Sequence, residues 1–300
     1  MTETVLVVGA SGYLGRSVVD RLDSDEESQG DRESEQDCRV VGTYCSTPAP
    51  NADVQFDFWT DDVGPILDEY DVDTVVYAAA NEYGGEVDTG NTDAGGDFAE
   101  RADRFAEQCS DRRVVYVSSA AVFDGTDREY VESDSRTPPD EYGQRLVTFE
   151  DAFAVHCEDL AVMRTSYLFG FSLGRLDHRL WRTRERLRTD ESVAYFTDMF
   201  KSPVLVTEAA QTVVALADSG VTGPVHVPTP RISVYEFHCE AMRALGIDPE
   251  PIERDSIPEE MDVAPDTSLD SERFDAVVGF ELSPVRAGLE AQLDAGAPGQ

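Results

Sequence analysis

Positive charge is the scarcest feature of this sequence. Lysine and arginine together number 24 against 61 aspartates and glutamates, and Lys201 is the only lysine. The resulting net charge of −37 argues against binding to DNA or to anionic membranes, because like charges repel. Such a surface also repels itself in dilute buffer, whereas molar salt shortens the Debye length to about 3 Å. We therefore expect a halophilic protein with neither a nucleic-acid nor a membrane partner.

Long apolar runs and cysteine motifs are also missing. No apolar stretch approaches the ~18 residues of a membrane span, and no signal segment precedes the first predicted strand, so a soluble cytoplasmic protein is expected. The five cysteines are scattered without a Cys-x-x-Cys spacing, which indicates neither a disulfide framework nor a zinc site. The four histidines are equally dispersed, and we expect no metal site.

The chain opens with an apolar run followed by a glycine-rich turn and an amphipathic stretch. This order is typical of a dinucleotide site, because the glycines let backbone N–H groups approach a pyrophosphate and the helix N-terminus supplies positive potential. The alternative is a βα turn that binds nothing. We predict cofactor binding by the turn, through Gly9, Ser11, Gly12, Tyr13, Leu14, Gly15 and Arg16.

Strand-like and helix-like segments alternate up to Gly170. Expected strands are 39–44, 54–58, 74–80, 113–119 and 160–166, expected helices are 61–70, 97–109 and 142–153, and the acidic segment 24–37 is expected to be a loop. Alternation indicates right-handed crossovers and hence a doubly wound parallel sheet of the Rossmann type. Later residues change pattern, with expected helices at 207–217 and 235–245. The sequence therefore predicts a dinucleotide-binding domain at 1–170 and a smaller C-terminal substrate lobe at 171–300.

Two hydroxyl side chains stand where a carbonyl group can be held. Ser119 ends a predicted strand, and Tyr142 begins a later predicted helix. Together with the N-terminal glycines, the segments Val-Ser-Ser-Ala-Ala-Val-Phe-Asp-Gly at 117–125 and Glu-Tyr-Gly-Gln-Arg at 141–145 resemble the extended short-chain dehydrogenase/reductase family. The similarity is closer to its dTDP-4-dehydrorhamnose reductase branch. Further matches to that branch run along most of the chain, at Asn91, 164–170, 198–203 and 264–270.

The resemblance implies roles for individual residues. It implies that Tyr142 donates a proton to the substrate carbonyl oxygen while nicotinamide delivers hydride to the carbon, and that Ser119 holds the same oxygen. It also implies that Asp57 lies on the adenine side of the cofactor. Ala78, Ala79 and Ala80 are similar to the family's turn on the nicotinamide side.

One position departs from the family pattern. A lysine four residues after the tyrosine binds the nicotinamide ribose in that family, and here the position is Leu146. Arg145 precedes it by one residue and shares the helix face of Tyr142, since positions +3 and +4 lie about 60° and 40° to either side of it. Arg145 is therefore either a displaced cation of the site or a partner of a surface carboxylate.

The cofactor is predicted to be NADP or NAD, with a slight preference for NADP. NAD-specific sites place an acidic residue at the end of the second strand to receive the ribose hydroxyls. Residues 42–46, Gly-Thr-Tyr-Cys-Ser, contain none. Ser11, Arg16 and Ser46 are candidate contacts to a 2′-phosphate, although Arg16 is equally suited to a surface salt bridge.

The expected function is that of an NAD(P)H-dependent reductase of a 4-keto-6-deoxy nucleotide sugar in surface-glycan synthesis. Ala120, Ala121 and Val204 replace residues usual in the reductase branch, so the sugar follows from the resemblance alone. The missing lysine motivates an alternative, a non-catalytic NAD(P)-binding regulatory subunit, because the branch is also similar to that of methionine adenosyltransferase. A nucleotide-sugar epimerase or dehydratase is a third interpretation. Assembly as a homodimer is left open.

Four arginines follow a helical spacing after the predicted sheet, at Arg175, Arg179, Arg182 and Arg186. Guanidinium groups bind diphosphates well, so this stripe is a candidate contact for a nucleotide-sugar substrate. Pairing with acidic neighbours is the alternative.

Overall fold

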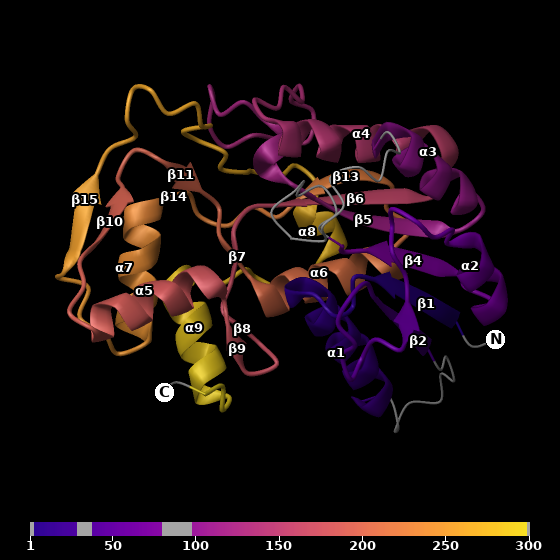
Figure 1. The fold of residues 1–300 in the computed structure, drawn as a ribbon, viewed down its shortest axis with the longest axis horizontal. Helices are drawn as coiled ribbons and strands as arrows, with labels where there is room; N and C mark the ends of the chain where they lie inside the picture. The colour runs from indigo at the N-terminus through magenta and orange to yellow at the C-terminus, as the bar shows by residue number, and fades with distance from the viewer. Residues whose placement is uncertain (1–2, 29–37, 80–97, 299–300) are drawn as a thin grey trace. The chain divides into compact units, whose positions relative to one another are not determined.

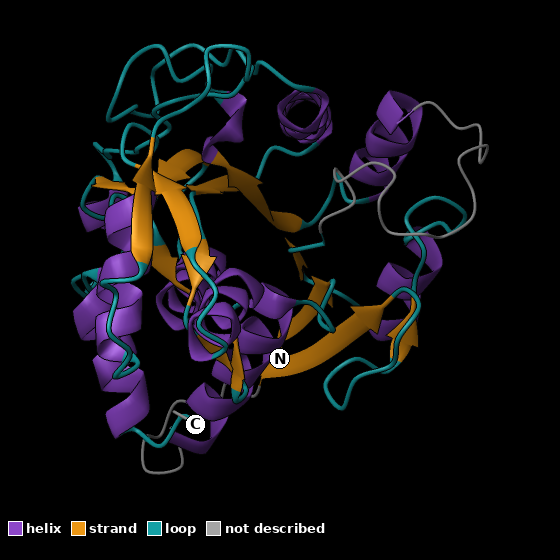
Figure 2. Cartoon of the chain, turned by 60° about the vertical axis from the view of Figure 1, so that its left-hand side comes forward, coloured by secondary structure: helices purple, strands orange, loops and turns teal. Residues whose placement is uncertain are grey.

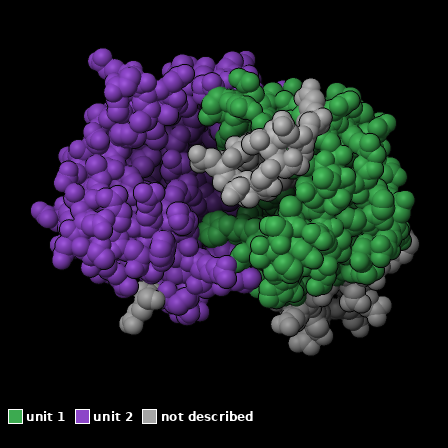
Figure 3. Space-filling view, viewed as in Figure 1, with its two compact units in different colours: residues 1–118, 140–163, 210–224 green, residues 119–139, 164–209, 225–300 purple. Residues whose placement is uncertain are grey.

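A computed structural model describes residues 3–28, 38–79 and 98–298. Contacts divide the chain into two compact units, which Figure 3 colours separately. Unit 1 contains residues 1–118, 140–163 and 210–224, and unit 2 contains residues 119–139, 164–209 and 225–300. The boundary predicted at residue 170 treats the two parts as consecutive, whereas these units are interleaved along the chain.

A seven-stranded sheet forms the framework of the first unit. Its strands in chain order are β1 (Glu3–Val8), β2 (Cys38–Tyr44), β3 (Val54–Gln55), β4 (Thr74–Tyr77), β5 (Arg113–Ser119), β6 (Leu160–Thr165) and β13 (Gly223–His226). Across the sheet they run β13-β6-β5-β4-β1-β2-β3. β1 pairs in parallel with both β2 and β4, so the strand order reverses there. This order confirms the predicted doubly wound Rossmann fold.

Helices cover both faces of the sheet (Figures 1 and 2). The helices of this part are α1 (Tyr13–Ser28), α2 (Gly64–Tyr70), α3 (Phe98–Gln108), α4 (Glu141–His156) and α6 (Val206–Asp218). In Figure 1, α3 and α4 lie on one face and α1 and α6 on the other. Strands buried on both faces are nearly continuous apolar runs, as β1 and β4 are here.

An aromatic core fixes α4 on the sheet. Phe149 of α4 is fully buried, and its ring centroid lies 4.7 Å from that of Tyr77 on β4 and 5.3 Å from that of Tyr116 on β5. Tilted aromatic pairs at this separation add to the stabilisation that burial provides. The helix that begins beside Tyr142 is therefore held by packing along its later turns.

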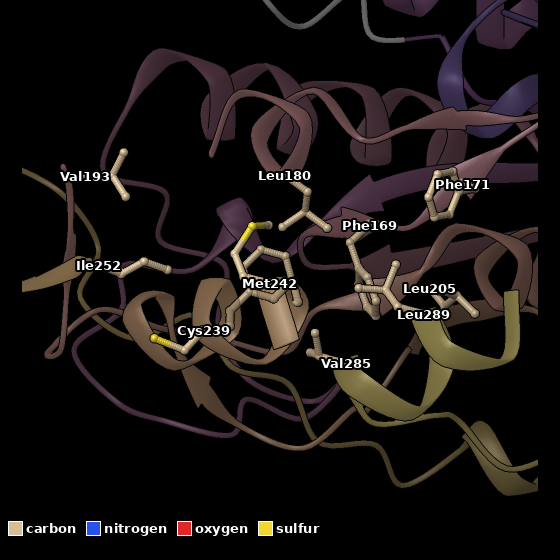
Figure 4. Packing of buried hydrophobic residues seen from close by; sticks show 12 residues of the cluster. Phe169, Phe171, Leu180, Val193, Leu205, Cys239, Met242, Ile252, Val285 and Leu289 are labelled. Carbon is tan, nitrogen blue, oxygen red and sulfur yellow. The ribbon is translucent and has the colours of Figure 1, made fainter. Parts of the chain in front are cut away.

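The second unit is built from short helices and two-stranded sheets. Its helices are η1 (Ala120–Val122), α5 (His178–Arg188), α7 (Val234–Ala244), α8 (Phe274–Val277) and α9 (Val285–Asp294). Its strands pair as β7 (Leu168–Phe169) with β12 (Val204–Leu205), β8 (Phe171–Ser172) with β9 (Arg175–Leu176), β10 (Val193–Phe196) with β15 (Ile252–Asp255), and β11 (Phe200–Lys201) with β14 (Ile232–Ser233). A buried cluster that includes Phe169, Leu180, Met242 and Leu289 joins α5, α7 and α9 to several of these strands (Figure 4).

Several predicted boundaries differ from the observed ones. α1 extends to Ser28, so the start of the predicted acidic loop is helical, and residues 29–37 lie outside the described part. The predicted strand 54–58 is shortened to β3, because Asp57 closes a turn there. α2 starts at Gly64 rather than residue 61, since Pro65 favours the first turn of a helix.

Candidate active site

The glycine turn between β1 and α1 is closed by the chain's own backbone. Gly12 donates its N–H to the carbonyl of Gly9 at 2.9 Å. Gly9 has φ +86°, and a Cβ built on it would lie 2.8 Å from the backbone N and Cα of Ala79. A Cβ on Gly15 would lie 2.2 Å from the Gly9 carbonyl oxygen. Side chains are excluded at these positions, which is what close approach of a pyrophosphate requires.

The second strand and the loop after it fix the turn from one side. Thr43 of β2 accepts a hydrogen bond from the N–H of Gly9 at 3.1 Å. The side-chain amide of Asn51 donates to the carbonyl of Ala10 at 3.2 Å. These bonds hold the turn in shape through the chain's own groups, so a cofactor would meet a preorganised cradle.

Arg16 lies along the same turn. Its Nη2 donates to the carbonyl of Ser11 at 2.6 Å, and its Nε donates to the carbonyl of Gly12 at 3.0 Å. Arg16 therefore supports the loop that the sequence assigned to the cofactor. The carbonyls it binds lie in the predicted pyrophosphate turn, and Ser46 is exposed in the loop after β2. A contact from either residue to a 2′-phosphate stays a prediction.

The other predicted cofactor residues surround this turn or lie next to it. Tyr13 begins α1 and is half-buried, whereas Leu14 is buried and offers a ligand only its backbone. Ala78 donates its N–H to the carbonyl of Val8 at 3.0 Å, which places the end of β4 beside the end of β1. Ala79 packs against Gly9, while Ala80 and Asn91 lie outside the described residues.

Asp57 closes the turn between β3 and α2. Its Oδ1 accepts a hydrogen bond from the N–H of Trp59 at 2.9 Å, and its own N–H donates to Asp61 Oδ2 at 2.8 Å. The side chain is half-buried. The carboxylate thus shapes the loop after the third strand, and its contact with adenine stays a prediction.

Tyr142 stands in the first turn of α4. Asp140 caps this helix by accepting the N–H of Gly143 at 2.7 Å, which fixes the turn from which the half-buried phenol projects. Capping at one end and the aromatic core at the other leave the position of the helix well defined. The structure therefore holds Tyr142 on a rigid element, as catalytic side chains require.

The cation near Tyr142 is engaged with a carboxylate. Arg145 forms an ion pair with Glu141 one turn earlier, and its guanidinium carbon lies 5.5 Å from the ring centroid of Phe98. Leu146, at the position of the family lysine, is only 2% exposed. A lysine there would have to bury its ammonium group, which is costly without a partner. Of the two sequence-based interpretations, pairing with a surface carboxylate is the one observed.

Ser119 is the last residue of β5 and the N-cap of η1. Its Oγ accepts a hydrogen bond from the N–H of Ala121 at 3.2 Å. Among the described residues its hydroxyl proton has no acceptor, so it is available for donation to a ligand oxygen. Ser119 belongs to unit 2 and Tyr142 to unit 1, and their convergence on one substrate atom stays a prediction.

The motif Phe-Asp-Gly after Ser119 has a structural role. Asp124 accepts hydrogen bonds from the backbone and hydroxyl of Thr126 and from the hydroxyls of Tyr130 and Thr137, all at 2.8–2.9 Å. These bonds, the Thr126 backbone bond first, lower the pKa of Asp124 to about 2. Gly125 follows with φ +74°, where a Cβ would lie 2.9 Å from the Cα of Ala264. The motif thus fixes the loop that follows the candidate serine.

Sequence analysis missed a buried pair behind the candidate residues. Ser118 donates its hydroxyl to Glu150 Oε1 at 2.6 Å, and the two residues are 3% and 4% exposed. This bond ties β5, immediately before Ser119, to α4, two turns beyond Tyr142. The available signal was a glutamate on the face of α4 that otherwise carries Leu146, Phe149 and Phe153.

Replacement of Glu150 is expected to show its positioning role. Glu150→Leu removes the acceptor of the buried Ser118 hydroxyl and is expected to lower the free energy of unfolding by about 1–3 kcal/mol, together with kcat. Glu150→Gln keeps an acceptor oxygen and is expected to retain most of both. Denaturant unfolding and single-turnover rates measure the two effects, and equal losses in both variants would contradict this role.

Two arginines of the stripe pair with carboxylates. Arg179 donates to Asp177 at 3.2 Å, and Arg186 donates to Glu191 at 3.2 Å. Arg179 also lies 4.3 Å from the ring centroid of Tyr167, and Lys201 lies 5.7 Å from the same ring while donating to Thr267 at 2.7 Å. Internal pairing is thus observed at two of the four predicted positions.

Neither metal-binding groups nor membrane spans are found where the structure describes the chain. Within residues 3–28, 38–79 and 98–298, no three His, Cys, Asp or Glu side chains are grouped to hold a metal ion. In the same ranges no helix combines the length and the apolar character that crossing a membrane requires.

Comparisons with known proteins give a consistent result. The family model described as RmlD substrate binding domain matches residues 3–297. A curated relative in Haloferax volcanii, the probable low-salt glycan biosynthesis reductase Agl14, is 33% identical over 240 residues, which cover 74% of this chain and 73% of the relative. A dTDP-4-keto-6-deoxy-D-glucose reductase of Streptomyces niveus is 30% identical over 260 residues, with 83% and 81% covered.

A solved structure shares the fold over nearly the full length. The dTDP-4-dehydrorhamnose reductase of Bacillus anthracis, in complex with NADP, superposes with a TM-score of 0.78 at 19% identity, covering 98% of this chain and 100% of that one. Its identity is too low to say more than that the architecture is shared. The match of the family model and the two relatives goes further, and the chain belongs to the family of the RmlD substrate binding domain.

Proposed function

We propose that this protein is an NADPH-dependent reductase that converts the 4-keto group of a 6-deoxy nucleotide sugar into an alcohol, for glycan synthesis. The observation that carries the proposal is the preformed glycine turn at the point where strand order reverses, within a chain of this family. Open α/β sheets bind ligands at that point. The names of the two curated relatives, both reductases, support the reaction class.

Each candidate residue has a defined role in the proposed reaction. A bound nicotinamide supplies hydride to the carbonyl carbon. Tyr142 gives its phenolic proton to the carbonyl oxygen, so the ketone gains one hydride and one proton. Ser119 donates its hydroxyl proton to the same oxygen. The N–H of Ala121 binds the Ser119 Oγ as an acceptor, so the hydroxyl proton remains for this bond. Gly9, Gly12 and Gly15 hold the pyrophosphate.

The preference for NADPH over NADH is argued from this chain's residues alone. The end of β2, at 42–46, carries no carboxylate that would repel a 2′-phosphate. Arg16 lies at the glycine turn and brings a fixed positive charge there. Comparing kcat/KM for the two reduced cofactors under identical conditions tests this preference.

Arg145 is proposed to stabilise the bound cofactor ribose while it remains paired with Glu141. Arg145→Gln is then expected to raise the KM for NADPH by about tenfold, the effect of losing one charge-assisted hydrogen bond. Glu141→Gln is the matched control, because it breaks the same ion pair and leaves the guanidinium in place. If the two variants change KM equally, Arg145 serves only the ion pair.

The experiment that tests the function follows NADPH oxidation at 340 nm. Purified protein in molar KCl is mixed with NADPH and dTDP-4-keto-6-deoxy-L-mannose, and the sugar product is identified by mass spectrometry. A reductase consumes one NADPH for each alcohol formed. A nucleotide-sugar epimerase or dehydratase returns its cofactor unchanged and oxidises no added NADPH, and a regulatory subunit binds the cofactor without turnover. Either of those results would replace the proposal.

A further inference from the structure

A cavity of about 490 Å³ lies in unit 2, and its lining includes neither Ser119, Tyr142 and Arg145 nor the residues of the glycine turn. Its walls come from the β8–β9 hairpin, from α5 and from Pro298. The side chains that bear on its chemistry are Arg175, His178, Trp181 and Arg184. Ligand pockets commonly have volumes of about 300–1,000 Å³, so a small organic molecule fits here.

One face of α5 supplies three of these side chains. His178, Trp181 and Arg184 are spaced three residues apart and therefore line one side of the helix. Leu180 and Thr183 face the core instead, and both are fully buried. The direction of the three cavity-lining side chains is thus set by packing on the opposite face.

The cavity is positively charged in a strongly acidic protein. Its lining contains two arginines and no aspartate or glutamate, although the chain carries 61 acidic residues. Among the described residues Arg175 forms no ion pair. The unpaired charge of Arg175 is suited to an external anion.

Arg184 is the more buried of the two arginines that line the cavity. Its side chain is 10% exposed, and its Nε donates to Glu185 at 3.1 Å. Within the part of the chain that the structure describes, its two Nη atoms have no acceptor. These Nη groups therefore keep donors that the oxygens of an anion in the cavity can accept.

An aromatic platform stands beside these charges. Trp181 is 45% exposed, and its ring is stacked with that of His178 at a centroid distance of 5.9 Å and an interplanar angle of 28°. An indole face accepts a stacked nucleobase.

We propose that this cavity binds a nucleoside phosphate, with the phosphate held by Arg175 and Arg184 and the base stacked on Trp181. Guanidinium groups bind phosphate oxygens through paired donors. Stacking of the base on the Trp181 ring would make a nucleotide bind more tightly than a simple anion. The site goes beyond the proposed reductase function, because none of its residues takes part in that chemistry.

Fluorescence of Trp181 tests the site locally. The chain has two tryptophans, so a Trp59→Phe background leaves Trp181 as the sole reporter. AMP, inorganic phosphate and adenosine are titrated into this protein in the presence of saturating NADPH, at fixed KCl. AMP is expected to quench the emission with saturation, and phosphate is expected to compete with it. Adenosine is expected to bind at least tenfold more weakly than AMP.

Variants separate a binding site from general surface charge. Arg184→Met and Arg175→Met are each expected to weaken AMP binding at least tenfold, and Arg175 is exposed enough that its loss leaves the fold intact. Arg188→Met is the control, since Arg188 lies on the same helix outside the cavity lining. The proposal is overturned if AMP leaves Trp181 emission unchanged, if adenosine binds as tightly as AMP, or if Arg175→Met and Arg188→Met weaken binding equally.

Discussion

Phenylalanine in place of Tyr142 is expected to lower kcat by about two to four orders of magnitude, the range that general acid catalysis contributes. The affinity for NADPH is expected to stay unchanged, because the substitution removes one oxygen atom from a half-buried side chain and leaves the glycine turn untouched. Single-turnover oxidation of NADPH measures the rate, and fluorescence titration with NADPH measures binding.

Tyr70→Phe provides the control for this substitution. Tyr70 ends α2, is half-buried and lies 5.1 Å from the guanidinium carbon of Arg39, so it loses an equivalent hydroxyl away from the candidate chemistry. Activity at the unmodified level in Tyr142→Phe would remove the phenol from the reaction. Loss of NADPH binding in that variant would instead show that Tyr142 serves the cofactor.

Alanine at Gly15 is expected to destabilise the protein by about 3 kcal/mol and to abolish detectable NADPH binding. The residue lies in α1, where alanine normally stabilises a helix by about 1 kcal/mol relative to glycine. Here the new Cβ would lie 2.2 Å from the Gly9 carbonyl oxygen and 2.9 Å from the Cα of Ala10. Because both contacts are with backbone, the turn itself must move, and the clash outweighs the helix propensity.

Gly220→Ala is the matched control for the backbone clash. Gly220 is exposed, and nothing lies within 4 Å of a Cβ built there. Its substitution is expected to change the free energy of unfolding by no more than about 0.5 kcal/mol. Denaturant midpoints in molar KCl compare the two variants. A Gly15→Ala protein as stable as Gly220→Ala and still able to bind NADPH would show that the turn is not the cofactor cradle.

The sequence was sufficient for the framework of the fold. The apolar runs of β1, β4 and β5 are buried on both faces of the sheet, and runs of that kind are recognisable without coordinates. The glycine turn was equally visible, because only glycine fits where backbone passes backbone, as at Gly9 and Gly15. The local sequence pattern was therefore enough to predict a doubly wound parallel sheet and the candidate cofactor turn.

Local sequence patterns could not predict which hydrogen-bond and ion-pair partners the polar side chains have. Helical spacing left two roles for Arg145, and only the structure shows its ion pair with Glu141. Glu150 gave no local sign of the Ser118 hydroxyl 32 residues earlier. The cavity residues are separated in the same way, since the helical spacing groups Arg175 with Arg179, Arg182 and Arg186 and leaves Arg184 outside the group. Each of these outcomes depends on contacts between elements that are distant in sequence.

The interleaving of the two units has a consequence for synthesis of the chain. The strand next to β6 at the sheet's edge is β13, at Gly223–His226, so the sheet is incomplete until those residues have left the ribosome. Before then the nascent polypeptide presents an open β6 edge, which is a hazard for aggregation. A fragment ending at residue 170 would retain that open edge permanently. Expression of the N-terminal part alone is therefore expected to yield insoluble material, and we expect the sheet to be completed only late in translation.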